Sequence, residues 1–218
     1  MEKAKIKLII FDFDGTLGDT RRNIVMTMQM TIAEHQLPYR NEDECASVIG
    51  LPLAGCFRTL FPDIQEEFIN QCAETYRRIF NENLQKIQPQ AFPGVVDTLA
   101  TLHQNGYVLT IASSRSRNSL TELTRQMGIA DYISMLLGAN DVKEAKPKPE
   151  PVLKTLEAMH FGANEALVVG DMDVDILMGA RAGARTCGVT YGNGSRETLA
   201  AAGADFIIDD FTELLAFL

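Results

Sequence analysis

The sequence has few cysteines, no tryptophan and no hydrophobic run long enough to cross a membrane. Four cysteines stand among 218 residues, without Cys-x-x-Cys spacing, and are too sparse for a disulfide framework. The longest apolar runs fall far short of the ~20 residues that span a bilayer. Residues 1–5 lead straight toward the first apolar run, without a secretory signal. We therefore predict a cytoplasmic protein with reduced thiols and no membrane partner.

Positive charge is also scarce. The 20 Lys and Arg residues are outnumbered by 29 Asp and Glu residues, which gives a formal net charge of −9. This balance disfavours non-specific binding to nucleic acids and anionic membranes. Any phosphate site must therefore be locally basic, through a cation or a few Lys and Arg residues. With 218 residues, the chain can form one large domain, or a domain with a smaller one inserted. We expect a monomer or a weak homodimer.

Strand and helix patterns alternate through most of the chain. A first strand is expected at 5–12. From 93 onward, predicted strands and helices alternate. The strands are 107–112, 135–137, 166–169, 186–190 and 206–208, and the helices 94–106, 116–127, 150–159, 173–182 and 197–202. Such alternation predicts an α/β fold with a doubly wound, Rossmann-like parallel sheet.

Residues 18–87 interrupt this pattern and contain no convincing strand. A helix is expected at 20–37, with Asp19 or Thr20 as its start, and a second apolar stripe runs from Ile64 to Ile79. We predict an inserted all-helical domain over 18–87 and a core formed by 1–17 and 88–218.

The first strand ends in two aspartates separated by one residue, Asp12 and Asp14, followed by Gly15 and Thr16. Residues two apart on a strand share a face, and the carboxyl edge of a parallel sheet is where such folds bind ligands. Two carboxylates this close repel each other unless a cation or a shared proton relieves them. A polar turn after a strand is the plainer alternative.

Three further polar clusters follow predicted strands. Ser113-Ser114-Arg115 offers hydroxyl and backbone N–H groups that suit phosphate oxygens, although a serine-rich turn would look similar. Lys146 lies in a proline-rich segment that fixes its direction or merely stiffens a surface loop. Within 170–175, Asp173 is expected as a helix N-cap, which leaves Asp171 and Asp175 as oxygen ligands for a hard cation.

Together, Asp-x-Asp-Gly-Thr, Ser, Lys-Pro and Gly-Asp-x-x-x-Asp, in this order, resemble the motifs of the haloacid dehalogenase-like superfamily. The resemblance covers nearly the whole chain. The insertion is similar to that superfamily's smaller helical cap, and 203–209 resembles the phosphoglycolate phosphatase-like branch. Ser114 stands where that branch usually has Asn.

The resemblance implies a Mg²⁺-dependent phosphatase of a small phosphorylated metabolite, with phosphoglycolate as the first substrate. It makes Asp12 the nucleophile that forms an aspartyl-phosphate and Asp14 the general acid and base. Mg²⁺ would bind Asp12, the backbone carbonyl of Asp14 and Asp171, with Asp175 acting through water.

The remaining positions follow from the same resemblance. Ser113 and Lys146 would hold the phosphoryl oxygens, with Gly15, Ser114 and Arg115 beside the substrate. Thr16 would orient Asp14 or its loop.

Several alternatives stay open. A sugar phosphomutase or a pyrophosphatase of the same superfamily could use these motifs. A dehalogenase gives Asp14 no proton to transfer, and a phosphate-binding module without turnover would not need the full motif set.

Substrate choice is expected to reside in the insertion. The turn 48–52 resembles the family's specificity loop, and its Gly50 would allow close approach of the backbone. Arg21, Arg22 and Arg58 are candidate partners for a substrate carboxylate, because the guanidinium fork matches that group.

Overall fold

The computed structural model describes residues 5–84 and 86–218. Residues 1–4 and 85, which belong to the segments assigned above to the core and the insertion, lie outside the described residues. No helix within the described ranges is long and apolar enough to cross a membrane.

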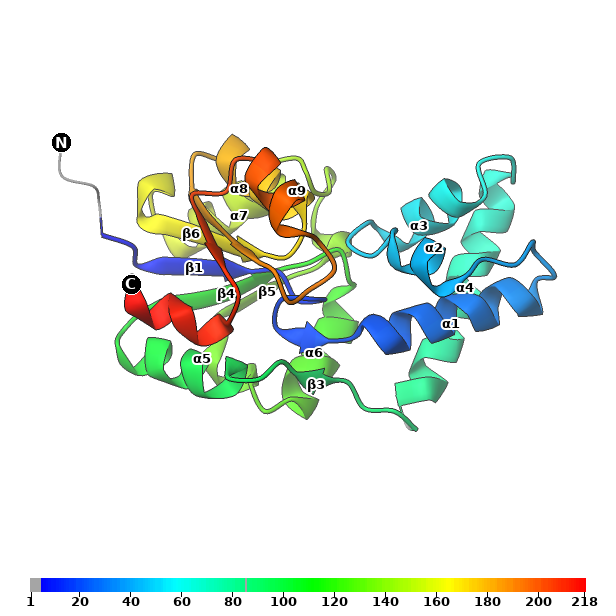
Figure 1. Cartoon of the computed structure of the whole chain (residues 1–218), viewed down its shortest axis with the longest axis horizontal. Coiled ribbons are helices and arrows are strands. Elements are labelled where there is room, and N and C mark those ends of the chain that lie inside the picture. Colours follow the sequence, from blue (N-terminus) through cyan, green and yellow to red (C-terminus); the bar gives the residue numbers. More distant parts are fainter. Residues whose placement is uncertain (1–4, 85) are drawn as a thin grey trace.

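A parallel sheet forms the centre of the molecule (Figure 1). Across the described residues it has the strand order β5-β4-β1-β6-β7-β8, so β1 lies in the middle. The strands are β1 (Leu8–Phe11), β4 (Val108–Ala112), β5 (Met135–Leu137), β6 (Ala166–Gly170), β7 (Arg185–Val189) and β8 (Phe206–Ile208). The predicted α/β class with a doubly wound sheet is thereby confirmed.

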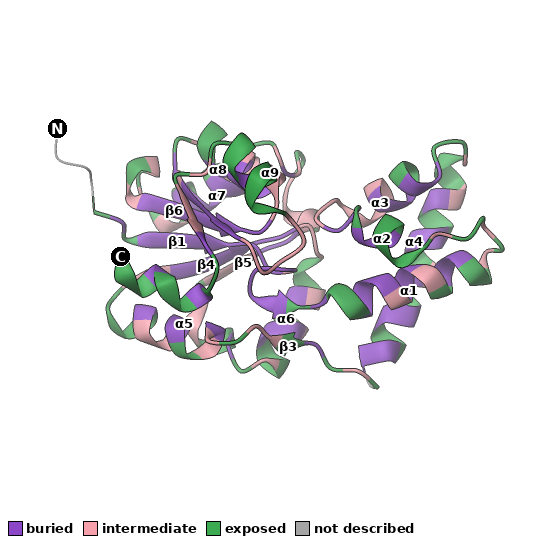
Figure 2. Cartoon of the chain, in the orientation of Figure 1, coloured by how far each residue is buried: buried purple, intermediate pink, exposed green. Residues whose placement is uncertain are grey.

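Helices cover both faces of this sheet, and the burial of β1 shows how (Figure 2). Its side chains alternate between the faces. Ile9 and Phe11 join one apolar cluster, and Leu8 and Ile10 join the other. The first cluster includes residues of α5 (Val95–Gln104), α6 (Arg117–Gln126) and the C-terminal 3-10 helix η4 (Phe211–Ala216). The second includes residues of α7 (Glu150–Met159) and α8 (Asp173–Arg181), while α9 (Arg196–Ala201) packs beside α8.

Four helices form a separate bundle beyond the carboxyl ends of the strands (Figure 1). They are α1 (Arg21–Glu34), α2 (Glu42–Ala46), α3 (Leu53–Leu60) and α4 (Glu66–Leu84), and we refer to them as the cap. Within the cap, α1 and α4 share the most extensive contact. The predicted stripe of Ile24, Met28 and Ile32 is buried here.

The two connections between cap and sheet pair with each other. Strand β2 (Gly18–Asp19) runs antiparallel to β3 (Gln90–Ala91). The expectation of no strand within 18–87 is therefore wrong at its first two residues. Strands this short carry no periodic pattern, and only the meeting of two distant segments creates them.

Most remaining differences concern the ends of elements. The first strand begins at Leu8 rather than residue 5, and the helix expected at 20–37 ends at Glu34. Three further 3-10 helices were not predicted: η1 (Ala130–Tyr132), η2 (Ala139–Asp141) and η3 (Ala163–Glu165). Such short turns lack a helical stripe and depend on local hydrogen bonds.

Candidate active site

Asp12 and Asp14 leave the central strand at its carboxyl end. The backbone N–H of Asp12 still donates to the Val169 carbonyl at 2.8 Å, so Asp12 continues the pairing with β6. A tight turn follows, in which the Phe13 carbonyl accepts hydrogen bonds from the backbone N–H groups of Thr16, Leu17 and Gly18. The Asp12 side chain is buried, with 5% of the residue exposed. The sheet thus fixes Asp12, and the turn carries the residues after it.

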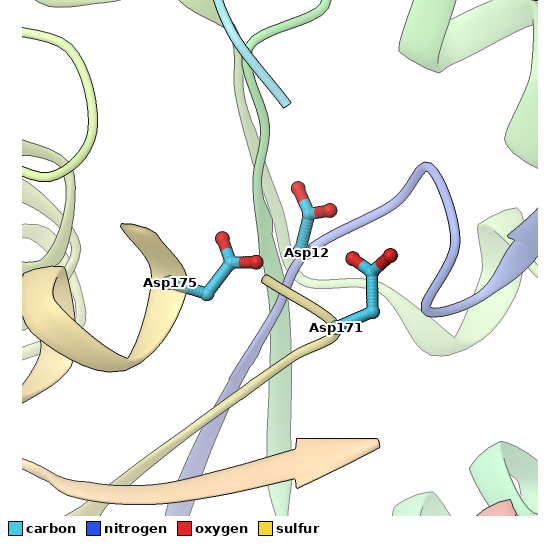
Figure 3. Close-up of side chains that lie close together, drawn as sticks. All are labelled: Asp12, Asp171 and Asp175. Carbon is cyan, nitrogen blue, oxygen red and sulfur yellow. The ribbon is translucent and has the colours of Figure 1, made fainter. Parts of the chain in front are cut away.

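Three carboxylates from separate segments meet here (Figure 3). Asp12 follows β1, Asp171 follows β6, and Asp175 lies in the first turn of α8. One carboxylate oxygen from each lies within 4.8 Å of the others, and all three residues are buried. Oxygen ligands at such spacing suit a hard divalent cation.

Lys146 is the cation that the chain itself brings to this cluster. Its Nζ donates to Asp12 Oδ1 at 2.5 Å and to Asp175 Oδ1 at 2.6 Å, and its side chain is 3% exposed. One ammonium therefore faces three buried carboxylates. Buried like charges are strongly unfavourable without further compensation. The donor set consequently fits Mg²⁺ at Asp12, Asp171 and Asp175.

The excess of buried negative charge also shifts the pKa values of Asp12, Asp171 and Lys146. Burial raises the pKa of Asp12 well above its usual value, and Asp175, Asp171 and Asp14 add to this while Lys146 opposes it. Burial and the charge of Asp175 raise the pKa of Asp171 to about 7. For Lys146, burial favours the neutral amine, but Asp12 and Asp175 prevail and hold its pKa above the usual value. A bound cation would restore the ionised carboxylates.

Asp14 is held differently from Asp12. Its Oδ1 accepts from Thr20 Oγ1 at 2.6 Å and from Arg115 Nη2 at 2.5 Å, and its Oδ2 accepts from Arg115 Nε at 3.0 Å. The guanidinium carbon of Arg115 lies 4.7 Å from the centre of the Phe80 ring, which belongs to the cap. Arg115 therefore links the carboxylate of Asp14 to the cap.

The roles expected for Thr16 and Asp173 need correction. Thr16 Oγ1 donates to Asp171 Oδ1 at 3.3 Å, and Thr20 instead takes the hydrogen bond to Asp14. Asp173 is the first residue of α8 rather than its N-cap. The hydrogen bond at the N-terminus of α8 comes from Asp175, whose Oδ2 accepts from the Met172 N–H at 3.1 Å. A capping-box contact of this kind reaches back from the third helical position.

A cavity of about 630 Å³ lies between the sheet edge and the cap. Six of the predicted residues line it: Asp12, Asp14, Gly50, Ser113, Ser114 and Arg115. Ser113 Oγ accepts from the Arg115 N–H at 3.2 Å, and Ser114 Oγ donates to the Gly50 carbonyl at 2.6 Å. The Gly50 turn of the cap is thus tied directly to the loop after β4.

The arginines proposed as carboxylate partners do not line this cavity. Arg58 pairs with Glu66 at 2.5 Å, and Arg21 lies 3.7 Å from Asp43. Arg22 is exposed. The lining instead includes Arg77 of α4 and Arg115. Helical periodicity gave no indication of which arginines would turn toward the sheet.

Residues 9–189 match the family described as haloacid dehalogenase-like hydrolase. The chain belongs to this family. It is 34% identical to "Probable phosphatase IndB" of Dickeya dadantii, over 95% of this chain and 91% of that protein. It is 34% identical to pyrophosphatase PpaX of Anoxybacillus flavithermus, over 98% of this chain and 97% of that protein. It is 30% identical to phosphoglycolate phosphatase of Vibrio vulnificus, over 99% of this chain and 97% of that protein.

A solved structure of the family supports the same assignment. The "Putative haloacid dehalogenase-like hydrolase" of Bacteroides fragilis superposes with a TM-score of 0.91 at 27% identity, over 96% of this chain and all of that one. The family and the hydrolase class predicted from the motifs are confirmed. The four motifs, from residue 12 to residue 175, all fall within the matched residues.

Members of the site that sequence reasoning missed surround Asp171. The backbone N–H and the side-chain amide of Asn193 donate to Asp171 Oδ2 at 2.7 and 3.0 Å. A Cβ on Gly192 would lie 2.4 Å from the Gly15 carbonyl oxygen, and one on Gly15 would lie 2.1 Å from Asp171 Oδ2. The run Gly192-Asn193-Gly194 after a strand was the available signal, since close backbone approach requires glycine.

Proposed function

We propose that this hydrolase is a Mg²⁺-dependent phosphatase of a small phosphorylated metabolite and that it acts through an aspartyl-phosphate. The observation that carries the proposal is the contact of buried Asp12 with Lys146 beside two further carboxylates. The names of the relatives, a phosphatase, a pyrophosphatase and a phosphoglycolate phosphatase, support phosphorus chemistry. Residues 18–87 would form the cap domain over a core of 1–17 and 88–218.

In the first step, Asp12 attacks phosphorus. Lys146 holds Oδ1 of Asp12, so Oδ2 forms the new bond to phosphorus while the bond to the leaving oxygen breaks. Mg²⁺, held by Asp12, Asp171, Asp175 and the backbone carbonyl of Asp14, would offset the negative charge that nucleophile and phosphoryl group share. Ser113 would donate its hydroxyl to a phosphoryl oxygen.

Asp14 serves both steps as the proton carrier. It gives a proton to the leaving alkoxide, then takes one from the water that attacks the aspartyl-phosphate, which releases phosphate and restores Asp12. To do so, its carboxyl group must exchange the contact with Arg115 for the substrate oxygen. Because Arg115 also lies on Phe80, that exchange would be sensitive to the position of the cap.

The four cysteines support a reducing, cytoplasmic location. All are free and buried. Burial raises the pKa of Cys45 to about 11 and of Cys56 to about 12, so these thiols stay protonated near neutral pH.

Phosphate release from ethyl phosphate and 2-phosphoglycolate, with Mg²⁺ and with a chelator, tests the function. We expect phosphate release that depends on Mg²⁺. With a ³²P-labelled ester, the unaltered protein should carry an acid-stable label, and Asp12→Asn should carry none. A folded enzyme that releases no phosphate from any ester with Mg²⁺ present would refute the proposal.

A further inference from the structure

The cavity over Asp12 has two chemically different sides. Toward the core its lining is polar, with serine and asparagine side chains such as Ser113, Ser116, Ser119, Asn118 and Asn140. Toward the cap it is mostly apolar, and the larger side chains there include Ile24, Met28, Ile49, Leu53, Tyr76 and Phe80. The phosphoryl group therefore belongs on the core side, and the leaving group must lie against the cap.

The cap side offers little to an anionic leaving group. Among the described residues, Arg77 is the only charged side chain that the cap contributes to the lining, and it is exposed. Arg115 lies on the core side of the cavity, in the loop after β4, and does not add a charge to the cap side. A second phosphate or a carboxylate placed against the apolar lining would lose its hydration without a full replacement.

The size of the cavity points the same way. Its volume of about 630 Å³ falls within the range of pockets that enclose drug-sized ligands. A glycolate group would leave most of that space to water held against apolar side chains. Tyr76 and Phe80 lie stacked in the lining, with ring centres 5.9 Å apart and an angle of 15° between the planes. Aromatic surface of this kind packs favourably against another ring or a bulky aliphatic group.

We propose that the leaving group of the natural substrate is a bulky, uncharged group of apolar or aromatic character, and not glycolate or phosphate. This inference rests on the proposed function. The cap residues Met28, Ile49, Leu53, Tyr76 and Phe80 select it, and the gain comes from removing apolar surface of both partners from water.

The test compares phosphate esters of primary alcohols, whose alkoxides differ little in basicity. With Mg²⁺, we expect kcat/KM for 2-phenylethyl phosphate to exceed that for ethyl phosphate by about 10-fold or more, since pockets distinguish single methylene groups by such factors. We expect 2-phosphoglycolate and pyrophosphate to be poorer substrates than 2-phenylethyl phosphate. Preference for 2-phosphoglycolate over 2-phenylethyl phosphate would overturn the inference and leave the proposed function intact. Preference for pyrophosphate would overturn the inference and favour a pyrophosphatase over the proposed function.

Two cap variants and a matched control locate the effect. Ala54→Phe fills part of the cavity, and Leu53→Asn places an amide in its apolar side; both residues are half-buried lining residues. Each should lower the ratio of kcat/KM for 2-phenylethyl phosphate to that for ethyl phosphate several-fold. Arg78→Ala, on the outer side of α4 where Arg78 pairs with Glu34 and Glu82, should leave the ratio unchanged.

Melting curves identify variants that fail to fold, in which case the comparison of substrates with the unaltered enzyme decides alone. A ratio unchanged in both folded cap variants would show that this surface does not hold the leaving group. No hydrolysis of any ester would instead refute the proposed function and the inference with it.

Discussion

Lys146 and Asp12 illustrate how individual residues determine this site. The ammonium of Lys146 fixes one oxygen of Asp12 and one of Asp175, from two different elements, and all three side chains are buried. A charge-assisted contact in such surroundings is strong, and it also costs a large desolvation free energy. Proteins retain arrangements of this kind where chemistry requires them.

The first prediction concerns Asp12→Asn, which preserves shape and removes the attacking charge. We expect phosphatase activity to fall by on the order of 10⁴-fold or more, because the step that forms the aspartyl-phosphate is lost. Steady-state kinetics measure the loss, and a melting curve shows that the variant folds. Asp63→Asn, the same exchange at an exposed site, should retain full activity. Near-normal turnover by folded Asp12→Asn would contradict the assigned nucleophile.

The second prediction concerns pH and Asp171. The pKa of Asp171 is about 7 in the folded protein against an ordinary 3.8. Between these two pH values the folded protein therefore keeps a proton on Asp171 that the unfolded chain has already released. The free energy of unfolding in metal-free buffer therefore falls as pH rises from about 4 to about 7, and stays low above that. Asp171→Asn removes this contribution, so its melting temperature relative to the unaltered protein should rise across this window.

Melting curves at several pH values, in chelator and in Mg²⁺, measure the effect of Asp171→Asn. The variant also loses the two hydrogen bonds that Asn193 gives to Asp171 Oδ2, which changes its melting temperature, so the readout is how the difference between the two proteins changes with pH. Mg²⁺ should stabilise the unaltered protein most above pH 7 and the variant much less. Parallel curves in chelator would contradict the raised pKa of Asp171, and equal stabilisation of both proteins by Mg²⁺ would show that Asp171 is not a ligand.

Among the secondary-structure elements, the turns after the strands decide the site. The turn after β7 brings Gly192 and Gly194 against Asp171 so closely that a Cβ on Gly194 would lie 2.1 Å from the Asp171 carbonyl oxygen. Asn193, between them, gives Asp171 two hydrogen bonds. Groups that hold a metal ligand in place tune the affinity of the site nearly as much as the ligands do.

The third prediction follows for Gly192→Ala. The added methyl would meet the Gly15 carbonyl at 2.4 Å, so the turn must move away and Asn193 with it. We expect the apparent Mg²⁺ affinity to fall about 10- to 100-fold, measured from the Mg²⁺ dependence of activity. Gly128→Ala is the control: its φ of +69° makes alanine strained, but nothing lies within 4 Å. It should lower stability without changing the Mg²⁺ dependence.

Across the whole molecule, cap and sheet are joined by a paired hinge and by side-chain contacts. The chain passes between the sheet and the cap twice, and the two connections pair with each other as β2 and β3. The hydrogen bond from Ser114 to the Gly50 carbonyl and the packing of Arg115 on Phe80 close the other side of the cavity. Motion about the hinge would break these contacts together, and closure of this kind excludes water from the reaction. The expected monomer or weak homodimer stays a prediction.

The fourth prediction tests this closure through Ser114→Ala. Loss of one hydrogen bond of about 1 kcal/mol should favour the open cap and lower kcat/KM about 5-fold, with little change in melting temperature. Small-angle scattering should show a larger radius of gyration than in the unaltered protein. Ser47→Ala removes a hydrogen bond within the cap, from Ser47 Oγ to the Glu44 carbonyl, and should change neither quantity. Identical scattering and kinetics in all three proteins would exclude Ser114 as a closing contact.

Much of the fold is determined locally and could be predicted from the sequence. The ranges 135–137, 150–159 and 206–208 agree with β5, α7 and β8, because apolar runs, periodicity and flanking Gly or Pro depend on neighbouring residues alone. The positions of Asp12, Asp171 and Ser113 after strands follow from the same runs. Since parallel strands end at one edge, their convergence was expected as well.

Only the tertiary structure decided the contacts between segments that are distant in the chain. Gly18 meets Ala91, Asn193 reaches Asp171, and Arg77 rather than Arg58 lies at the cavity. Each of these depends on the relative position of elements, which a local pattern does not encode. Arginine is compatible with solvent and with a carboxylate alike, so its role follows from the partner that folding brings to it. The sequence by itself determined the chemistry of the phosphoryl end; packing of the cap decided the shape and apolar character of the other end.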